Sequence, residues 1–366
     1  MRSNIITSGL AIALAFSGVI APAMGQPIDR TIAQAGKTSE IDRAITEAER
    51  LFKEGNAESL RKAIGQLEKA LEFSRGEDNN PKRAYVLLSL GRIHSDLGES
   101  TKAIEYYKLA LPIFRLVGNR LKEGTVLGGI GSAYSNLGDN KQALKYHNEA
   151  LLISRAMNDY FGEAAILTNI GSIHSDFGDN KQALKYYNEA LQIFRTVDHR
   201  FGEATTLNNI GRVHVALGEN SRALEYFNFA LQIFRTISDR SGEAVTLTNI
   251  GVLYSVTGES QKALDYYNLA LPILRAVGNR SQELKVLSNI GRVYDVVGEK
   301  QRALDYYNLS LSTSRSIGDL LSVSLVLNNI ATLYLDLGKK QKALEQYSGH
   351  FWGRKIDEED IHPLGC

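Results

Sequence analysis

The chain has 366 residues, of which 42 are lysine or arginine and 41 are aspartate or glutamate. This balance excludes an overall positive field that would attract nucleic acid or an anionic membrane. The single cysteine, Cys366, excludes an internal disulfide, and the 6 prolines permit long helices.

The first 25 residues have the order of a secretory signal. Arg2 gives a short positive start, residues 5–21 are almost wholly apolar or small, and an Ala-Pro-Ala-Met-Gly stretch follows. Residues 1–25 are therefore predicted to be a signal peptide cleaved after Ala23 or Gly25. The mature protein is expected to be exported, periplasmic or secreted, with no membrane span left. The alternative is an uncleaved membrane anchor, because an apolar run of about 17 residues is at the short edge of a span. Residues 26–39 are polar and are predicted to be a spacer.

From residue 40 to residue 347 the sequence repeats itself every 40 residues. An Ile-Gly, a second glycine seven residues later, an Ala-Leu and a Tyr-Tyr-Asn return in most units. Self-similarity at one period indicates stacked supersecondary units, each in contact with its neighbours only. The first unit, residues 40–80, keeps Ala63 and Ala70 but has Leu51 and Glu58 in place of the two glycines, as expected of a degenerate capping helix pair.

Each unit of the array over residues 81–347 is predicted to form two antiparallel helices. In residues 160–196, apolar residues recur at steps of three and four, which is the helical period. Gly178 suits the left-handed position that ends a helix, and Asp179 can cap the next helix. Gly171 and Ala183 are small where the two helices are expected to cross, since a larger side chain would push the axes beyond roughly 8–10 Å.

The pattern stops after Tyr347, and residues 348–366 share nothing with it. They are predicted to form a disordered tail. A frameshift, a truncated gene and a native short tail are all compatible with this ending, and of these we favour a truncated relative of a longer protein.

The repeat resembles the tetratricopeptide repeat. Leu167, Gly171, His174, Ala183, Tyr187 and Ala190 stand at the spacing of that signature, although the period is 40 rather than the usual 34 and arginines such as Arg195 stand near the place of its proline. The longer form is similar to the repeats of kinesin light chains, Pins-type modulators and bacterial proteins with a C-terminal CHAT protease-like domain. The resemblance implies an all-α, right-handed superhelical solenoid of seven to eight antiparallel helix pairs.

The sequence offers few candidates for chemistry. His362 and Cys366 lie in the short tail with nothing to position them as a nucleophile and its base. His94, His174 and His214 occupy the signature tyrosine position, and equivalent atoms in consecutive units are expected on the order of 10 Å apart, too far to share one metal ion. No glycine-rich loop follows a strand. We therefore expect no enzymatic activity, cofactor or metal.

A row of asparagines marks the candidate binding site. Asn169, Asn209, Asn249, Asn289 and Asn329 recur two residues before the repeat glycine or its alanine replacement. The resemblance implies that such first-helix positions line an inner groove, where an amide can pair with any peptide bond. The alternative is that each asparagine bonds a neighbouring loop or repeat. The predicted peptide-binding groove comprises Thr168, Asn169, Ser172, Asn208, Asn209, Arg212, Thr248, Asn249, Ser288, Asn289, Arg292, Asn328 and Asn329.

The predicted function is an exported bacterial scaffold, monomeric, whose groove binds a peptide or protein and no nucleic acid. Arg92, Arg212 and Arg292 would favour an acidic partner. Two other functions remain open: the sensor half of a CHAT-type protease-like or signalling protein, and a purely architectural spacer.

Overall fold

The structure, a computed structural model, describes residues 28–54, 57–74 and 80–351, and every element in these ranges is an α-helix. The predicted signal peptide and the tail from residue 352 lie outside the described residues. The chain divides into two compact units, residues 1–197 and residues 198–366, which are described separately.

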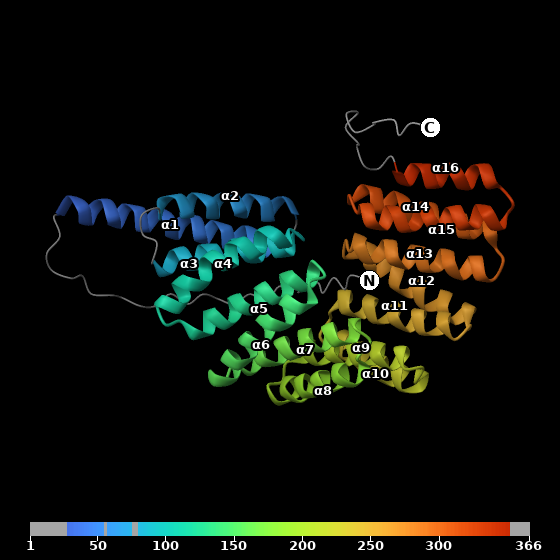
Figure 1. Cartoon of the computed structure of the whole chain (residues 1–366), viewed down its shortest axis with the longest axis horizontal. Helices are drawn as coiled ribbons and strands as arrows, with labels where there is room; N and C mark the ends of the chain where they lie inside the picture. Colours follow the sequence, from blue (N-terminus) through green and yellow to red (C-terminus); the bar gives the residue numbers. More distant parts are fainter. Residues whose placement is uncertain (1–27, 55–56, 75–79, 352–366) are drawn as a thin grey trace, which may run out of the picture. The chain divides into compact units, whose positions relative to one another are not determined.

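The first unit contains eight helices among its described residues (Figure 1): α1 (Ile28–Glu54), α2 (Ala57–Phe73), α3 (Pro81–Asp96), α4 (Ser100–Leu116), α5 (Arg120–Asn136), α6 (Asn140–Ala156), α7 (Tyr160–Asp176) and α8 (Asn180–Thr196). The described part of the second unit contains α9 (Arg200–Ala216), α10 (Asn220–Thr236), α11 (Arg240–Val256), α12 (Ser260–Ala276), α13 (Arg280–Val296), α14 (Lys300–Ser316), α15 (Leu320–Asp336) and α16 (Lys340–Phe351).

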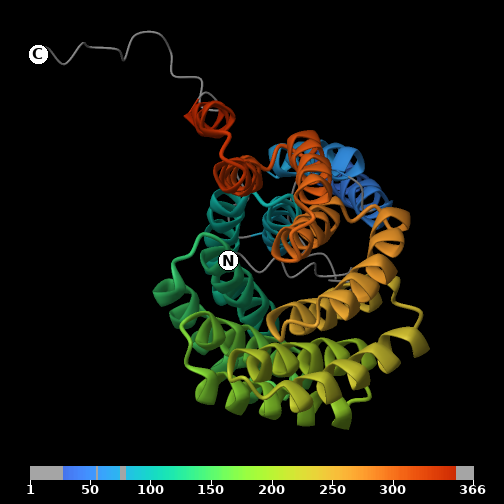
Figure 2. The same ribbon diagram turned by 90° about the vertical axis from the view of Figure 1, so that its right-hand side faces the viewer.

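Within each unit the helices pack as consecutive pairs, an odd-numbered first helix against an even-numbered second helix. Figure 2 looks nearly along the axes of one such pair, α15 and α16, which lie side by side. Each second helix also packs against the next first helix of its unit, and some first helices of adjacent pairs touch, as α9 and α13 both do with α11. The predicted all-α solenoid of helix pairs is confirmed.

The turn inside each pair follows the expected backbone chemistry. Gly178 has φ +76°, a conformation that costs glycine little because it has no Cβ. The Asp179 N–H donates to the His174 carbonyl (2.9 Å), which closes the end of α7. The Asp179 side chain then accepts from the Gln182 N–H (3.2 Å) and caps α8. The predicted break and cap are both confirmed.

In most helix pairs, a glycine in the first helix makes room for a ring from the second helix. A Cβ added to Gly211 would lie 2.6 Å from Cε1 of Phe227, and one added to Gly171 would lie 2.8 Å from Cδ1 of Tyr187. Both distances are below any normal carbon contact, so the pairs can approach this closely only because these residues are glycine. The expected close crossing is confirmed.

Buried glutamates link one pair to the next. Glu283, near the start of α13, is 4% exposed, and its two carboxylate oxygens accept from Arg275 Nε (2.8 Å) and Arg280 Nη1 (2.6 Å). Arg275 lies in the last turn of α12 and Arg280 starts α13, so the carboxylate joins two consecutive pairs. The same arrangement recurs at Arg115–Glu123–Arg120 and Arg235–Glu243–Arg240. The arginines near the usual proline position thus hold consecutive helix pairs together within each unit.

The structure differs from expectation at the start of α1. This helix begins at Ile28, so most of the predicted spacer is helical. Its composition is polar, but Thr31, Ala33 and Gln34 are compatible with a helix and no proline follows Pro27 before Pro81. Farther along, Ile41, Ala48 and other apolar side chains of α1 pack with α2 and α3.

At the other end of the chain, α16 continues to Phe351, four residues past the predicted end of the array. Over the described residues, no helix is both long and apolar enough to cross a membrane.

Candidate functional site

All thirteen predicted groove residues lie on first helices, within α7, α9, α11, α13 and α15. Thr168, Asn169 and Ser172 belong to the first unit and the other ten belong to the second unit. We name the side of α9, α11, α13 and α15 that carries these ten residues the first-helix surface. In the second unit, α11 contacts both α9 and α13, so the eight of these residues on these three helices lie on neighbouring elements.

The asparagine row includes hydrogen bonds between adjacent pairs. Asn249 Nδ2 on α11 donates to Asn208 Oδ1 on α9 (3.1 Å). In the first unit Asn169 Nδ2 on α7 donates to Ser132 Oγ on α5 (3.4 Å). Part of the asparagine row therefore forms hydrogen bonds from one helix pair to the next, which agrees with the structural interpretation of these residues. An amide has two N–H donors and an acceptor oxygen, so such a bond leaves Asn249 further capacity for a ligand.

Several predicted residues are turned into the protein. Thr168 and Thr248 are 7% and 6% exposed, and their hydroxyls donate to the Ala164 and Ala244 carbonyls of their own helices. Ser172 Oγ lies 2.9 Å from the Tyr187 hydroxyl. These hydroxyls have partners already, which favours a structural role for them. Contact with a ligand is more accessible to residues that face solvent.

The remaining members differ in exposure. Asn208 and Asn209 are 7% and 8% exposed, so each offers little surface to a ligand. Three members are exposed: Arg212, Arg292 and Asn328. Three others are half-buried: Ser288, Asn289 and Asn329. The amides and the two guanidiniums therefore remain the groups on which recognition can rest.

One basic residue was missed by the sequence reasoning. Lys285 on α13 is half-buried and lies one helical turn before Asn289. Burial lowers the pKa of Lys285, the nearby Arg212 guanidinium lowers it further, and Asp319 acts in the opposite direction. Lys285 and Arg212 come from α13 and α9, so the fold holds two cations near each other. Counting four residues back from the asparagine row would have found Lys285.

The first unit holds a similar pair of cations. Burial lowers the pKa of Lys122 on α5, and Arg92 on α3 adds to the effect. The Lys122 ammonium lies 5.7 Å from the centre of the Tyr85 ring, whose hydroxyl accepts from Asn119 Nδ2 (3.2 Å). Each unit therefore carries a half-buried lysine on a first helix that is affected by the charge of an arginine on another first helix.

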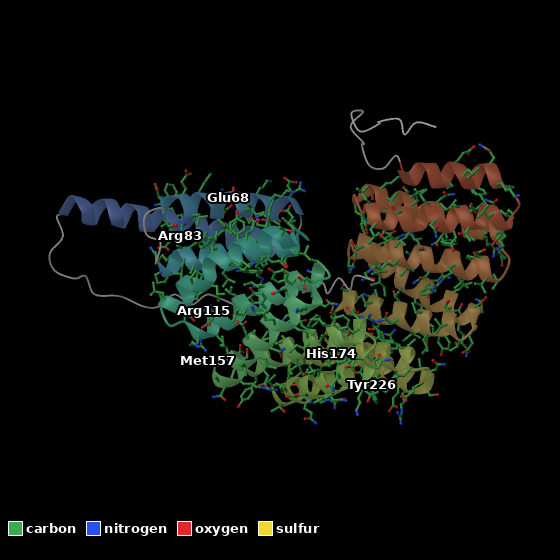
Figure 3. The ribbon with its side chains drawn as sticks, in the orientation of Figure 1. Glu68, Arg83, Arg115, Met157, His174 and Tyr226 are labelled. Atoms are coloured by element: carbon green, nitrogen blue, oxygen red, sulfur yellow. The ribbon has the colours of Figure 1, made fainter. Side chains whose placement is uncertain are left out.

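The histidines take the place of core tyrosines. His94 is 4% exposed, stacks on Tyr106 with 5.2 Å between ring centres, and places Nδ1 2.8 Å from a Glu99 carboxylate oxygen. His214 repeats this arrangement with Tyr226, which Figure 3 labels on the second unit. No group of three or more histidine, cysteine or acidic residues in the described ranges is arranged to hold a metal ion.

Comparison with known families decides the class of the protein. A tetratricopeptide repeat family matches residues 122–196, 202–276 and 242–316, together more than half of the chain, and a second tetratricopeptide repeat family matches residues 84–113. The chain belongs to the tetratricopeptide repeat proteins. No match was found among curated proteins.

Solved structures share this fold at low sequence identity. The apo form of RapI matches with a TM-score of 0.64 and 19% identity, over 76% of this chain and 99% of RapI. The apo quorum sensor NprR from B. thuringiensis matches with a TM-score of 0.62 and 15% identity, over 88% of this chain and 92% of NprR. The Rap conjugation gene regulator of plasmid pLS20, in complex with the Phr* peptide, matches with a TM-score of 0.59 and 17% identity, over 86% and 94% of the two chains.

Proposed function

We propose that this tetratricopeptide repeat protein is a scaffold whose first-helix surface binds an extended acidic peptide or an extended acidic segment of a partner protein. The observation that carries the proposal is the combination of one amide per helix pair with the cations Arg212, Lys285 and Arg292 on the same helices. The fold of the Rap regulator, whose structure contains the Phr* peptide, supports a peptide as ligand.

The spacing of the amides suits an extended chain. Packed helices lie roughly 8–10 Å apart, so the asparagine amides are expected to recur at about that interval. An extended chain advances about 3.3 Å per residue, so about three ligand residues would correspond to each helix pair. Amides bond the peptide backbone irrespective of side chain, which supplies affinity without strong sequence selection.

The charges add the selection. The pKa of Lys285 is lowered mainly by burial, and the positive charge of Arg212 adds a smaller lowering. A carboxylate bound between them would relieve the repulsion of these two charges and form charge-assisted hydrogen bonds. We therefore expect the preferred ligand to carry aspartate, glutamate or a terminal carboxylate at this point of the surface.

The test uses peptides selected from a displayed random library on the purified protein. Asn209→Ala combined with Asn249→Ala is expected to weaken a selected peptide by roughly a factor of 5 to 100, because each lost hydrogen bond contributes about 0.5–1.5 kcal/mol. Arg212→Ala combined with Arg292→Ala is expected to weaken it more at low salt than at high salt. Titration calorimetry or fluorescence anisotropy provides both affinities.

The matched control is Lys181→Ala combined with Lys185→Ala, two exposed residues of α8. This control is expected to leave affinity unchanged. If the asparagines are purely structural, their double variant will melt at a lower temperature while the folded fraction binds with unchanged affinity, and the proposal fails.

We also propose that the protein is exported through its N-terminal segment. The supporting observation is the positive, apolar and small-residue order of residues 1–25. Amino-terminal sequencing of protein from the exported fraction should begin just after Ala23 or Gly25. Retention of Met1 in a membrane fraction would support the uncleaved anchor instead.

A sensor role is the second candidate, favoured by the likeness in fold to the quorum sensor NprR. In that case ligand binding would be coupled to an effector such as the CHAT-type domain of similar repeat proteins. Reading the gene beyond codon 366 tests this point, since a following Cys-His domain, in frame or frameshifted, would support the sensor role.

A further inference from the structure

One first helix of the second unit carries valines where its neighbours carry polar or charged residues. Val245, Asn249, Val252 and Val256 on α11 follow one another at steps of four, three and four, so they share one face of the helix. Val245 and Val252 are half-buried, and Val256 is 60% exposed. We name these three residues the α11 valines. They lie on the first-helix surface, because Asn249 is a member of that surface.

Stacking of the helix pairs does not require apolar residues at these three positions. The equivalent residues are Thr205, Arg212 and Ala216 on α9, and Lys285, Arg292 and Val296 on α13. In α3, α5, α7 and α15 the second position is arginine, serine or threonine, and the third is aspartate or asparagine. Of the first helices from α3 to α15, α11 alone is therefore apolar at all three positions. Val296, which is 76% exposed, continues the apolar surface onto α13.

Cations flank the α11 valines on both sides. The helix α11 contacts both α9 and α13, and Figure 1 shows it between them. Arg212 on α9 and Arg292 on α13 are the equivalents of Val252, and Lys285 on α13 is the equivalent of Val245. Burial lowers the pKa of Lys285, and the charge of Arg212 from the other side of α11 lowers it further. The apolar face of α11 therefore lies between positive groups that influence one another.

Carboxylates of α13 and α15 near this face already have partners. Asp295 accepts a hydrogen bond from Lys300 Nζ (2.5 Å), which also lies 3.4 Å from Asp336. Asp319, which acts on Lys285, caps α15 by accepting from the Ser322 N–H (3.0 Å) and hydroxyl (2.7 Å). The three cations that flank the α11 valines are thus the ionic groups on this face that can meet a carboxylate of a ligand.

We propose that the α11 valines hold an apolar side chain of the bound segment, so that the preferred ligand carries an apolar residue two or three positions from an aspartate or glutamate. This inference rests on the proposed function and names the class of sequence that the surface prefers. Packed helices lie roughly 8–10 Å apart, and an extended chain advances about 3.3 Å per residue. A ligand residue opposite α11 therefore stands about three positions from a residue that meets a cation of α9 or α13.

The first test is selection from a displayed random peptide library on the full chain. Peptides with an aspartate or glutamate and an apolar residue two or three positions away are expected to be enriched. A parallel selection on Val245→Thr, Val252→Ser and Val256→Asn combined is expected to keep the acidic preference and to lose the apolar one. Each replacement already stands at the equivalent position of another helix, as Thr205, Ser172 and Asn136, so this triple variant is expected to fold.

The second test measures affinities by anisotropy, with one selected peptide and a copy that has serine in place of its apolar residue. On the unchanged chain the serine copy is expected to bind at least tenfold more weakly, at low and at high salt alike, because salt screens charges and not apolar contacts. On the triple variant the two peptides are expected to bind equally.

A single change and a matched control accompany these titrations. Val256→Asn alters the most exposed of the α11 valines and is expected to weaken binding of the selected peptide. Leu152→Asn on α6 removes a side chain that is 70% exposed on a second helix of the first unit, and it should bind as the unchanged chain does. If the triple variant loses its helical spectrum, Val256→Asn decides, and unchanged binding by it overturns the inference.

The outcomes separate this inference from the function on which it rests. Acidic peptides selected without an apolar preference, equal binding of both peptides to the unchanged chain, or undiminished binding of the selected peptide by the triple variant would each overturn the inference and leave the proposed function standing. Failure to select any peptide, selected peptides without an acidic preference, or affinities unaffected by Arg212→Ala with Arg292→Ala would overturn both.

Discussion

At the scale of single residues, His147 occupies a position that is tyrosine or phenylalanine in five other helix pairs. The equivalent residues are Tyr107, Tyr187, Phe227, Tyr267 and Tyr307. His147 is fully buried against Gly131, and neither ring nitrogen has a hydrogen-bond partner among the described residues. Burial lowers the pKa of His147 from 6.5 to about 4. Charging this ring would place an unpaired cation in the core of the first unit.

This buried histidine is expected to make the first unit sensitive to mild acid. The pKa is lower in the folded state, so the unfolded chain takes up the proton first as pH falls. The stabilising difference is fully present above pH 6.5 and is lost between pH 6.5 and about 4. Its full size is roughly 3 kcal/mol, at about 1.4 kcal/mol per pKa unit.

Urea unfolding at pH 7.5 and pH 5 measures the effect. His147→Phe should be more stable at both pH values and should lose less stability between them than the unchanged chain. The reciprocal change, Phe227→His in the second unit, should introduce acid sensitivity there. Parallel pH dependences in all three proteins would show that His147 is not the cause.

At the scale of elements, the buried glutamates account for how one helix pair is held to the next. Burial acts to raise the pKa of Glu283, but the hydrogen bonds from Arg275 and Arg280 outweigh it and hold the pKa below its usual range. The lowered pKa means that the carboxylate stabilises the fold above about pH 4.5, and that this contribution is lost as pH falls through the folded-state pKa. The acid range of this link therefore lies below the range in which His147 begins to act.

Glu283→Ala is expected to lower the free energy of unfolding by about 1–3 kcal/mol, because it removes two hydrogen bonds between charged groups at a nearly buried carboxylate. Chemical denaturation at pH 7 measures this. Glu259→Ala is the control, since Glu259 pairs with Lys262 on the open surface and such pairs contribute roughly 0–1 kcal/mol. Equal losses of unfolding free energy in the two variants would mean that the buried Glu283 ion pairs stabilise the fold no more than an exposed ion pair does.

Several features of the helices could be predicted from the sequence alone. Period, helix breaks and crossing glycines could all be predicted, because each depends on local chemistry that the repeat presents many times. The Arg275–Glu283 link could not, since it joins two helices across a turn and its residues form no known local motif. The early start of α1 was missed because polar composition does not distinguish a spacer from a solvated helix.

At the scale of the whole molecule, the positions of the candidate-site residues could be predicted from the sequence, but the contacts between them could not. The repeat places equivalent residues on equivalent helices, so the asparagine row could be found by counting. Which side chains meet depends on rotamers and on the register between pairs. The bond from Asn249 to Asn208, and the approach of Lys285 to Arg212, therefore became visible only in the structure.

The stacking of helix pairs also allows a prediction of how far a destabilising substitution affects the second unit. Gly211→Leu would place a side chain where a Cβ alone meets Phe227 at 2.6 Å, so the pair α9–α10 must open or shift. The expected loss is about 1–3 kcal/mol or more of unfolding free energy. Because each pair contacts only its neighbours within the unit, hydrogen exchange should accelerate in α9, α10 and α11, while α14 and α15 keep most of their protection.

Gly65→Ala supplies a control of opposite sign. Gly65 lies inside α2, and a Cβ added there would meet nothing within 4 Å. Alanine is favoured over glycine in a helix interior by about 1 kcal/mol, so this change should stabilise the chain. A melting curve for Gly211→Leu that matches that of the unchanged protein would mean that α9 and α10 do not cross at this glycine. Uniform loss of exchange protection from α9 to α16 would mean that the second unit unfolds as one block rather than pair by pair.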